Sequence, residues 1–233
     1  MPTKPLLSFL CCASLFAACG AMPPAPAPLA CTLVLLKTGA AKPSQEESAK
    51  VFAGHFANMQ RLAREGHLLV AGPYGKEKSD PALRGLFVLA TGDRAQAKAL
   101  AETDPGFQAG VFALEYRDFT TGAPLRENLA AELAAEDAAK AAGKELKPGD
   151  RIRAYVVANV SGGAAAQQAL AGRPGVLLLA ALDGDHTWAL LDAADLPAAQ
   201  ALLQPAQAAL GTVVLDSWYS SSGLAELPHR AAR

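Results

Sequence analysis

The chain has no excess of positive charge, few aromatic residues and few cysteines. Its 21 Lys and Arg residues against 22 Asp and Glu residues give a formal net charge of -1. It therefore lacks the basic surplus with which proteins neutralise nucleic-acid phosphates. Aromatic residues make up only 6%, but a hydrophobic content of 51% excludes a disordered chain. We expect a folded protein with no nucleic-acid partner and a core built largely from small side chains.

Several enzyme motifs are also missing. The sequence contains no G-x-S-x-G nucleophile elbow, no H-E-x-x-H zinc motif, no phosphate-binding P-loop and no dinucleotide fingerprint. We therefore expect neither a metal site nor a bound cofactor.

No apolar run is long enough to span a bilayer, which takes about 20 residues. A mostly apolar run of 13 residues, 6–18, lies near the start and is followed by Cys19 in the string LFAACG. This string resembles a bacterial lipobox, except that Phe16 replaces the usual Leu. We expect residues 1–18 to be a signal peptide and Cys19 to be lipidated. The alternative is an ordinary secretory peptide, cleaved after Ala18 or Ala21.

The segment after Cys19 is rich in proline and alanine and reads AMPPAPAP over residues 21–28. Such a segment favours an extended tether, which we place at residues 19–30. The predicted location is the cell envelope, with the chain anchored to the membrane by its lipid and facing the periplasm. Secretion is the alternative.

Cysteine usage then becomes simple. Cys11 and Cys12 leave with the leader, Cys19 is lipidated, and Cys31 remains alone. A single cysteine forms neither an internal disulfide nor a multi-cysteine zinc site. We expect Cys31 to be a small residue on the first strand.

The first half of the mature chain alternates short apolar runs with helix-start signals. Capping boxes at Ser44–Glu47 and Asp93–Gln96 open two helices that extend to about Glu65 and Thr103. The predicted strands are residues 31–38, 67–72, 83–91 and 111–119. The order β-α-β-β-α-β is the ferredoxin-like pattern.

The second half repeats this order. Residues 120–150 form a connection with a helix at 125–142, residues 151–224 form a second domain, and residues 225–233 form a tail. The predicted strands are 152–160, 176–182, 186–192 and 212–220, and the predicted helices are 164–171 and 196–210. Each ferredoxin-like sheet has one face without helices, which is either buried or in contact with water, and packing the two sheets face to face would bury both. The predicted fold class is α+β: tandem ferredoxin-like (βαββαβ) domains packed sheet to sheet as an intrachain pseudo-dimer.

The first half also carries recognisable motifs: GHF at 54–56, LAREGHLLVAGP at 62–73, GLFV at 85–88, DP at 104–105 and AGVF at 109–112. Over residues 31–119 it resembles the YCII family, whose members are small dimeric α+β barrels. The resemblance implies a catalytic dyad of His55 and Asp104 in a cleft, acting by acid–base chemistry on a small cyclic molecule. Gly72 and Pro73 end a strand, and their backbone either lines that cleft or simply terminates the strand.

The residues themselves support part of this. His55 shares a helical stripe with Phe52 and Leu62, and a half-buried histidine can act as a general base near neutral pH. The alternative is a core histidine bonded to the backbone. Asp104 is predicted at a helix C-terminus, where the helix dipole disfavours an anion, so it is either a turn residue or a functional carboxylate.

Other polar candidates are weaker. We expect His67 and His186 to be exposed, His229 to lie in the tail, and the run from Ser220 to Gly223 to be a loop. The second half has no histidine in its first helix, and Gln204-Pro205 stands where Asp104-Pro105 would be. We therefore predict a degenerate copy and at most one active site per chain.

Two hypotheses follow. The first is a lipid-anchored, YCII-like envelope protein in which His55 and Asp104 act as acid and base on an unknown small molecule. The second is a non-catalytic envelope module that binds a small ligand or a protein in the cleft between the domains. A haem- or quinone-handling relative is a weaker third reading.

Overall fold

The computed structural model describes residues 28–144, 149–182 and 184–228. The predicted signal peptide, Cys19, most of the tether and His229 lie outside the described residues. The first strand begins at Leu29, two residues earlier than predicted. Leu29 and Ala30 pair with Thr121 and Thr120 of the fourth strand, so they belong to the domain and not to the tether.

The first half follows the predicted order with one addition, the short helix α3. Its elements are β1 (Leu29–Thr38), α1 (Gln45–Arg64), β2 (Leu68–Pro73), β3 (Leu83–Leu89), α2 (Arg94–Ala101), α3 (Pro105–Gln108) and β4 (Phe112–Thr121). The strands form an antiparallel sheet of order β2-β3-β1-β4, which is the ferredoxin-like arrangement.

Both predicted helix starts are capped, but only one is a reciprocal box. At α1, the Ser44 amide donates to Glu47 Oε2 at 2.8 Å, and the Glu47 amide donates to Ser44 Oγ at 3.3 Å. At α2, Asp93 accepts from the Ala95 amide at 2.8 Å, whereas the Gln96 side chain bonds to the Thr91 hydroxyl. The second box is therefore only half formed.

The second half repeats the sheet. Its elements are α4 (Leu125–Ala141), β5 (Ile152–Val160), α5 (Gly163–Leu170), β6 (Val176–Ala181), β7 (Thr187–Leu191), α6 (Leu196–Leu203), η1 (Gln204–Ala206), α7 (Gln207–Leu210), β8 (Val213–Ser221) and η2 (Ser222–Glu226). The strand order β6-β7-β5-β8 matches that of the first sheet.

Three predictions for this half are corrected. The helix expected at 196–210 is divided into α6, η1 and α7, because Pro205 has no backbone N–H and its ring crowds the preceding turn. The run from Ser220 to Gly223 is not a loop, since Ser220 and Ser221 end β8 and η2 follows. The tail also begins later than residue 225, because Leu227 is buried in the core.

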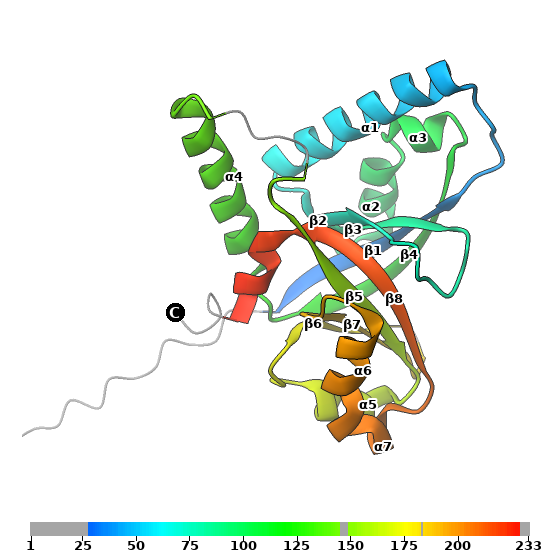
Figure 1. Ribbon diagram of the computed structural model, residues 1–233. Coiled ribbons are helices and arrows are strands. Elements are labelled where there is room, and N and C mark those ends of the chain that lie inside the picture. The colour runs from blue at the N-terminus through cyan, green and yellow to red at the C-terminus, as the bar shows by residue number, and fades with distance from the viewer. Residues whose placement is uncertain (1–27, 145–148, 183, 229–233) are drawn as a thin grey trace, which may run out of the picture.

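The two sheets pack face to face, with α1, α2 and α3 covering one outer side and α5, α6 and α7 covering the other (Figure 1). The core between the sheets takes residues from both halves, including Leu33 and Leu86 from the first and Tyr155 and Trp218 from the second. Separate cores lie beneath each helical layer. The tandem α+β architecture predicted from the sequence is thus confirmed.

The two sheets are joined by hydrogen bonds where β8 passes beside β2. The Trp218 indole donates to the Gly72 carbonyl at 2.9 Å, and the Ser220 hydroxyl donates to the Ala71 carbonyl at 2.7 Å. Gly72 permits this approach, because a Cβ there would lie 1.9 Å from the Tyr219 carbonyl oxygen. The two sheets are therefore held together along this edge by hydrogen bonds as well as by their shared core.

The connection α4 lies beside η2 (Figure 1). Its Glu132 forms an ion pair with Arg151 at 3.1 Å, and its Asp137 forms one with Arg64 of α1 at 3.0 Å. None of the helices in the described parts of the chain is both long and apolar enough to cross a membrane.

Candidate functional site

The structure brings His55 and Asp104 into contact. His55 lies in α1 and Asp104 just before α3, and His55 Nδ1 is 2.6 Å from Asp104 Oδ2. Both are buried, with 7% of His55 and 1% of Asp104 exposed. His55 is therefore paired with a carboxylate, not with the backbone, which was the alternative that the sequence left open.

Asp104 occupies a different position from the one predicted. Helix α2 ends at Ala101, and Asp104 is the N-cap of α3, where its Oδ1 accepts from the Gly106 amide at 2.7 Å. An anion is stabilised at a helix N-terminus, so the local dipole now favours this carboxylate. The signal was present as Asp followed by Pro, since Pro is common at the first helical position.

Four phenylalanine rings surround the imidazole. Phe87 is stacked on it with ring centroids 5.9 Å apart, and Phe112 meets it edge-on at 5.3 Å. Phe56 and Phe52 complete the group at 5.4 and 6.2 Å. The rings come from α1, β3 and β4, so no single stretch of sequence reveals them.

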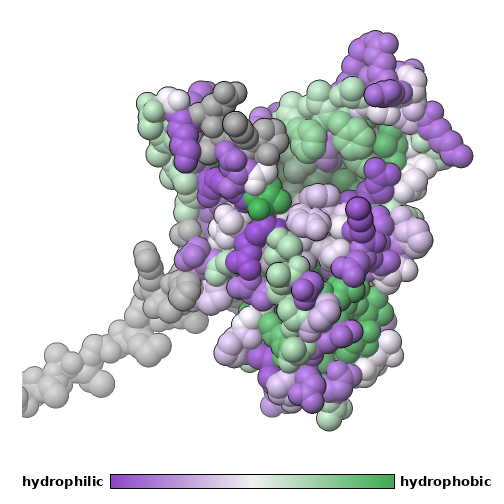
Figure 2. Space-filling view, viewed as in Figure 1, coloured by the Kyte–Doolittle hydropathy of each residue, from purple (hydrophilic) through white to green (hydrophobic). Residues whose placement is uncertain are grey.

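A cavity of about 170 Å³ opens at this group, lined in part by His55, Gly72, Pro73, Arg84 and Phe87. In the space-filling view a hydrophobic area lies beside α1, the helix that carries His55 (Figure 2). Phe56, also in α1, is 58% exposed. The surroundings of the dyad are therefore mainly apolar, with backbone from Gly72 and Pro73 on one wall.

The geometry leaves one imidazole nitrogen available. An ionised carboxylate only accepts hydrogen bonds, so Nδ1 is the nitrogen that donates to Asp104. Within the part of the chain that the structure describes, Nε2 of His55 has no hydrogen-bond partner. In the neutral ring this nitrogen carries a lone pair and can take a proton from a bound molecule.

Arg84 is a residue of this cavity that the sequence did not single out. It is exposed, lines the cavity from β3, and forms no side-chain hydrogen bond or ion pair with another described residue. A guanidinium at the edge of an apolar cavity is suited to hold an anionic group. The signal for it was a lone charged residue within the apolar run LRGLFVL.

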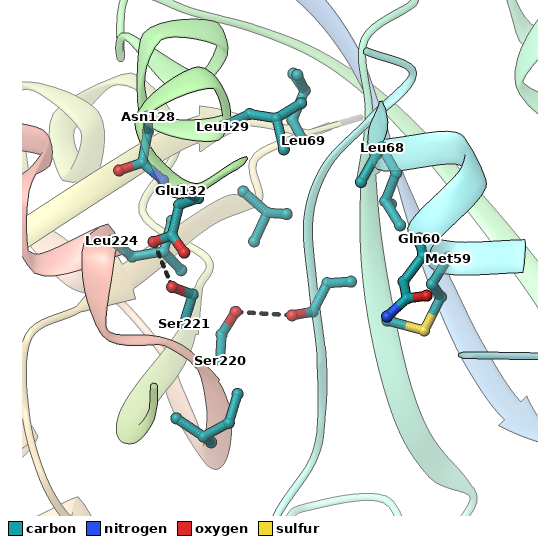
Figure 3. A pocket seen from close by; sticks show the side chains of 14 residues that line it. Met59, Gln60, Leu68, Leu69, Asn128, Leu129, Glu132, Ser220, Ser221 and Leu224 are labelled. Carbon is teal, nitrogen blue, oxygen red and sulfur yellow. Dashed lines mark hydrogen bonds between the residues drawn. The ribbon is translucent and has the colours of Figure 1, made fainter. Parts of the chain in front are cut away.

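A second cavity, of about 240 Å³, lies between α1, β2, α4 and β8 (Figure 3). Most of its polar groups already have partners. Ser221 donates to Glu132, and Ser220 donates to the Ala71 carbonyl at 2.7 Å (Figure 3). No histidine lines this cavity, so it offers no counterpart of the dyad.

The other histidines are not part of the dyad site. His186 is exposed, as predicted, whereas His67 is only half exposed. Its amide donates to Leu62 at the end of α1, and its carbonyl accepts from Ala90, so it is held between the helix and β3. In the described residues of the second half, no histidine contacts a carboxylate, and no described cluster of three or more His, Cys, Asp or Glu is arranged to hold a metal.

Comparisons with known proteins identify the first half. Residues 32–120 match the family model of the YCII-related domain. No curated protein matches the chain. A crystal structure of a proposed monooxygenase from Lactobacillus acidophilus NCFM is similar over 84% of this chain and 97% of its own, at 8% identity and a TM-score of 0.44. That likeness is too distant to bear on activity. The family match is direct, and it shows that residues 32–120 of this chain form a YCII-related domain.

Proposed function

We propose that this protein is an enzyme that uses His55 and Asp104 as an acid–base pair on a small molecule. The observation that carries the proposal is the 2.6 Å contact between His55 Nδ1 and Asp104 Oδ2, with Nε2 free beside a cavity of about 170 Å³. Asp104 serves more than the local turn, because its second oxygen contacts Nδ1 and holds the ring in one orientation.

The chemistry follows from the orientation of the ring. His55 Nε2 removes a proton from the bound molecule and becomes an imidazolium, and the Asp104 carboxylate stabilises that positive charge through Nδ1–H. The same proton then returns to another atom of the substrate, so no net charge is left on the enzyme. Positioned proton transfer of this kind contributes about 10²–10⁴ in rate.

The cavity also restricts the substrate. Phenylalanine rings favour a flat or cyclic apolar body, and Arg84 at the edge favours an anionic group such as a carboxylate. We therefore propose a small cyclic acid whose acidic C–H or O–H bond faces His55.

The test uses proton exchange as a readout that does not require the product to be known. Small cyclic carboxylates are screened for binding by ligand-observed NMR, and those that bind are incubated with the protein in D₂O. We expect at least one to incorporate deuterium, and His55→Ala to slow this by about 100-fold or more. His186→Ala, which changes an exposed histidine, is the matched control.

The proposal is wrong if His55→Ala keeps its circular dichroism spectrum and exchanges deuterium at the wild-type rate. Ligands that bind without any exchange in the wild type would favour the non-catalytic binding module.

We also propose that the protein is held at the bacterial envelope by a lipid on Cys19. The support is the LFAACG string and the proline-rich segment after it. Labelling with an alkyne-bearing fatty acid in a bacterial host tests this. The wild type should be labelled and sediment with membranes, and Cys19→Ser should do neither; an unlabelled wild type would favour the secretory alternative.

A further inference from the structure

The space between the two sheets is not completely filled. A cavity of about 600 Å³ lies there, bounded by β1, β3 and β4 of the first half and β5, β7 and β8 of the second. Ligand pockets in proteins have volumes of about 300–1,000 Å³, so the cavity is large enough for a small organic molecule. It is lined by Leu33, Leu35, Tyr74, Asn159, Trp188 and Asp216, among others.

Two polar side chains on its wall are buried without a full set of partners. Trp188 and Asp216 are each 1% exposed, and neither Trp188 Nε1 nor Asp216 Oδ2 has a hydrogen-bond partner among the described residues. Leaving such a group unpaired costs about 1–3 kcal/mol, and more for a charge. Most buried polar groups in native proteins are paired, so two unpaired groups beside one cavity need an explanation. We call these two atoms, Trp188 Nε1 and Asp216 Oδ2, the orphans.

Other polar atoms close to these two do have hydrogen-bond partners. The other tryptophan, Trp218, donates its indole N–H to the Gly72 carbonyl at 2.9 Å. The other oxygen of Asp216 accepts from the Ser79 amide. Tyr74 also lines the cavity, yet its hydroxyl forms no hydrogen bond with Asp216 Oδ2.

Strand pairing places the two orphans on one face of the second sheet. Trp188 pairs with Asn159 of β5, and Asp216 pairs with Val157 of the same strand. Asn159 and Val157 are two residues apart and so point to the same side. Because β5 lies between β7 and β8, the two backbones are about 10 Å apart. One molecule of modest length can therefore reach both.

Besides Asp216, the titratable side chains Lys37, Asp80, Arg117 and His186 line the cavity, and Arg117 lies 3.9 Å from Glu115. Lys37 forms ion pairs with Asp80 at 3.2 Å and with Glu115 at 2.9 Å. The Asp216 carboxylate has no cation of its own, and buried carboxylates are ordinarily paired with one. The leucines between these groups provide an apolar wall.

We propose that the inter-sheet cavity is a second ligand site, which binds a compact primary amine with an apolar body and a hydrogen-bond acceptor at its far end. The ammonium group donates to Asp216 Oδ2, and the acceptor receives the Trp188 indole N–H. Both atoms are shielded from solvent, so binding must shift the side chains that cover them.

This site is separate from the dyad. Leu33 and Leu35 of β1 face the inter-sheet cavity, whereas Leu36 of the same strand lines the His55 cavity on the other side of the sheet. A ligand in one site does not touch the other, so each proposal can fail without the other.

The experiment uses the two tryptophans as paired reporters. In ¹⁵N-labelled protein, tyramine serves as the probe, since it carries an ammonium group, a phenyl ring and a phenol oxygen. We expect tyramine to shift the Trp188 indole signal and to leave that of Trp218 in place. Phenethylamine, which lacks the acceptor, and 4-ethylphenol, which lacks the ammonium, should each bind at least about tenfold more weakly, or about 1.4 kcal/mol.

Two variants assign the contacts. Asp216→Asn keeps an oxygen for the Ser79 amide but turns the orphan acceptor into a donor, so it should weaken tyramine binding by about tenfold or more. Trp188→Phe keeps the aromatic bulk and should remove the preference for tyramine over phenethylamine. His55→Ala should bind tyramine like the wild type.

The proposal is overturned if tyramine and a set of related amines, at millimolar concentration, leave the Trp188 indole signal unmoved, because the cavity then holds water only. It is also overturned if Asp216→Asn binds tyramine with unchanged affinity. If Asp216→Asn does not fold, the Trp188→Phe variant decides. A preference for tyramine over phenethylamine that persists in this variant contradicts the contact between the Trp188 indole N–H and the phenol oxygen.

Discussion

Asp104 does two things with its two oxygens. Oδ1 caps α3 through the Gly106 amide, and Oδ2 holds His55. The sequence indicated both residues, but it placed Asp104 at the wrong end of a helix. A helix of four residues, Pro105–Gln108, is too short to show a periodic pattern, so only its Asp-Pro start could have revealed it.

The two roles of Asp104 can be separated by mutation. Asp104→Asn keeps an oxygen that can cap α3 but removes the charge that pairs with His55. Asp104→Ala removes both and should lower the free energy of unfolding by about 1 kcal/mol more than Asp104→Asn. Urea unfolding measures this difference, and equal stability of the two variants would contradict a capping role.

Cys31 gives a second prediction about a single side chain. Burial raises the pKa of its thiol to about 11, and the residue is fully buried between the sheets. At pH 8 only about a thousandth of such a thiol is ionised, and a thiol-modifying reagent in solution cannot reach it.

With Cys11, Cys12 and Cys19 changed to serine, we expect Cys31 to react with Ellman's reagent at least about 100-fold more slowly in the native protein than in urea. A native rate close to the unfolded one would show that this part of the inter-sheet core opens readily.

The strands show why the position of an element was predictable from the sequence and its exact first and last residues were not. Apolar runs located each predicted strand to within two residues at either end, because every strand contributes to a core. The ends depend on pairing: Leu29 and Ala30 are strand residues because β4 extends to Thr121 opposite them. Pairing partners far apart in the chain are not visible in a local pattern.

The contact of β2 with β8 predicts a strong effect of a small change. In Gly72→Ala, the new Cβ would meet the Tyr219 carbonyl oxygen at 1.9 Å and the Trp218 ring at 2.8 Å. Overpacking of this kind costs about 1–3 kcal/mol, and here it also strains the Trp218 hydrogen bond. Gly122→Ala is the matched control, because nothing lies within 4 Å of its Cβ position. Thermal unfolding should give a clearly lower midpoint temperature for Gly72→Ala than for Gly122→Ala.

The link between α2 and β4 predicts a pH dependence. Hydrogen bonds from Arg94 lower the pKa of Asp118, and Thr32 adds to this effect. A lowered native pKa means that the ionised Asp118 stabilises the fold above its unfolded pKa, and that this contribution is lost as pH falls through the native value.

At pH 7, Asp118→Asn should therefore lower the free energy of unfolding by about 0.5 kcal/mol, a small value because the ion pair is partly exposed. The difference from the wild type should shrink toward zero as pH falls through the lowered native pKa of Asp118. Urea unfolding at several pH values tests this, and a pH-independent difference would contradict the ion pair as its source.

The two halves form a single folded unit. The inner face of the first sheet packs against Tyr155, Val157 and Trp218 of the second, and this packing makes a continuous core. A sheet that lost this cover would expose a large apolar area.

Residues 28–122 produced alone should therefore self-associate, sheet to sheet, as a dimer or larger species. The full chain without its leader should be monomeric by the same measurement, light scattering after size exclusion. A monomeric, well-folded fragment would show that the second half is not needed as packing partner.

Local patterns in the chain were sufficient for the order of strands and helices, the repeat of that order and the capped start of α1, whereas His55 and Asp104 were paired only through the resemblance to the YCII family. These features depend on neighbouring residues and on alternation along one element, which a single sequence displays. The remaining features needed the packed tertiary structure: the four rings around His55, Arg84 at its cavity, the β2–β8 contact, and the unpaired Trp188 and Asp216. Each joins residues from different strands or helices, such as Trp218 and Gly72, which are 146 positions apart. Alternation shows which face a side chain takes, but the partner it meets there depends on how the two sheets close on each other.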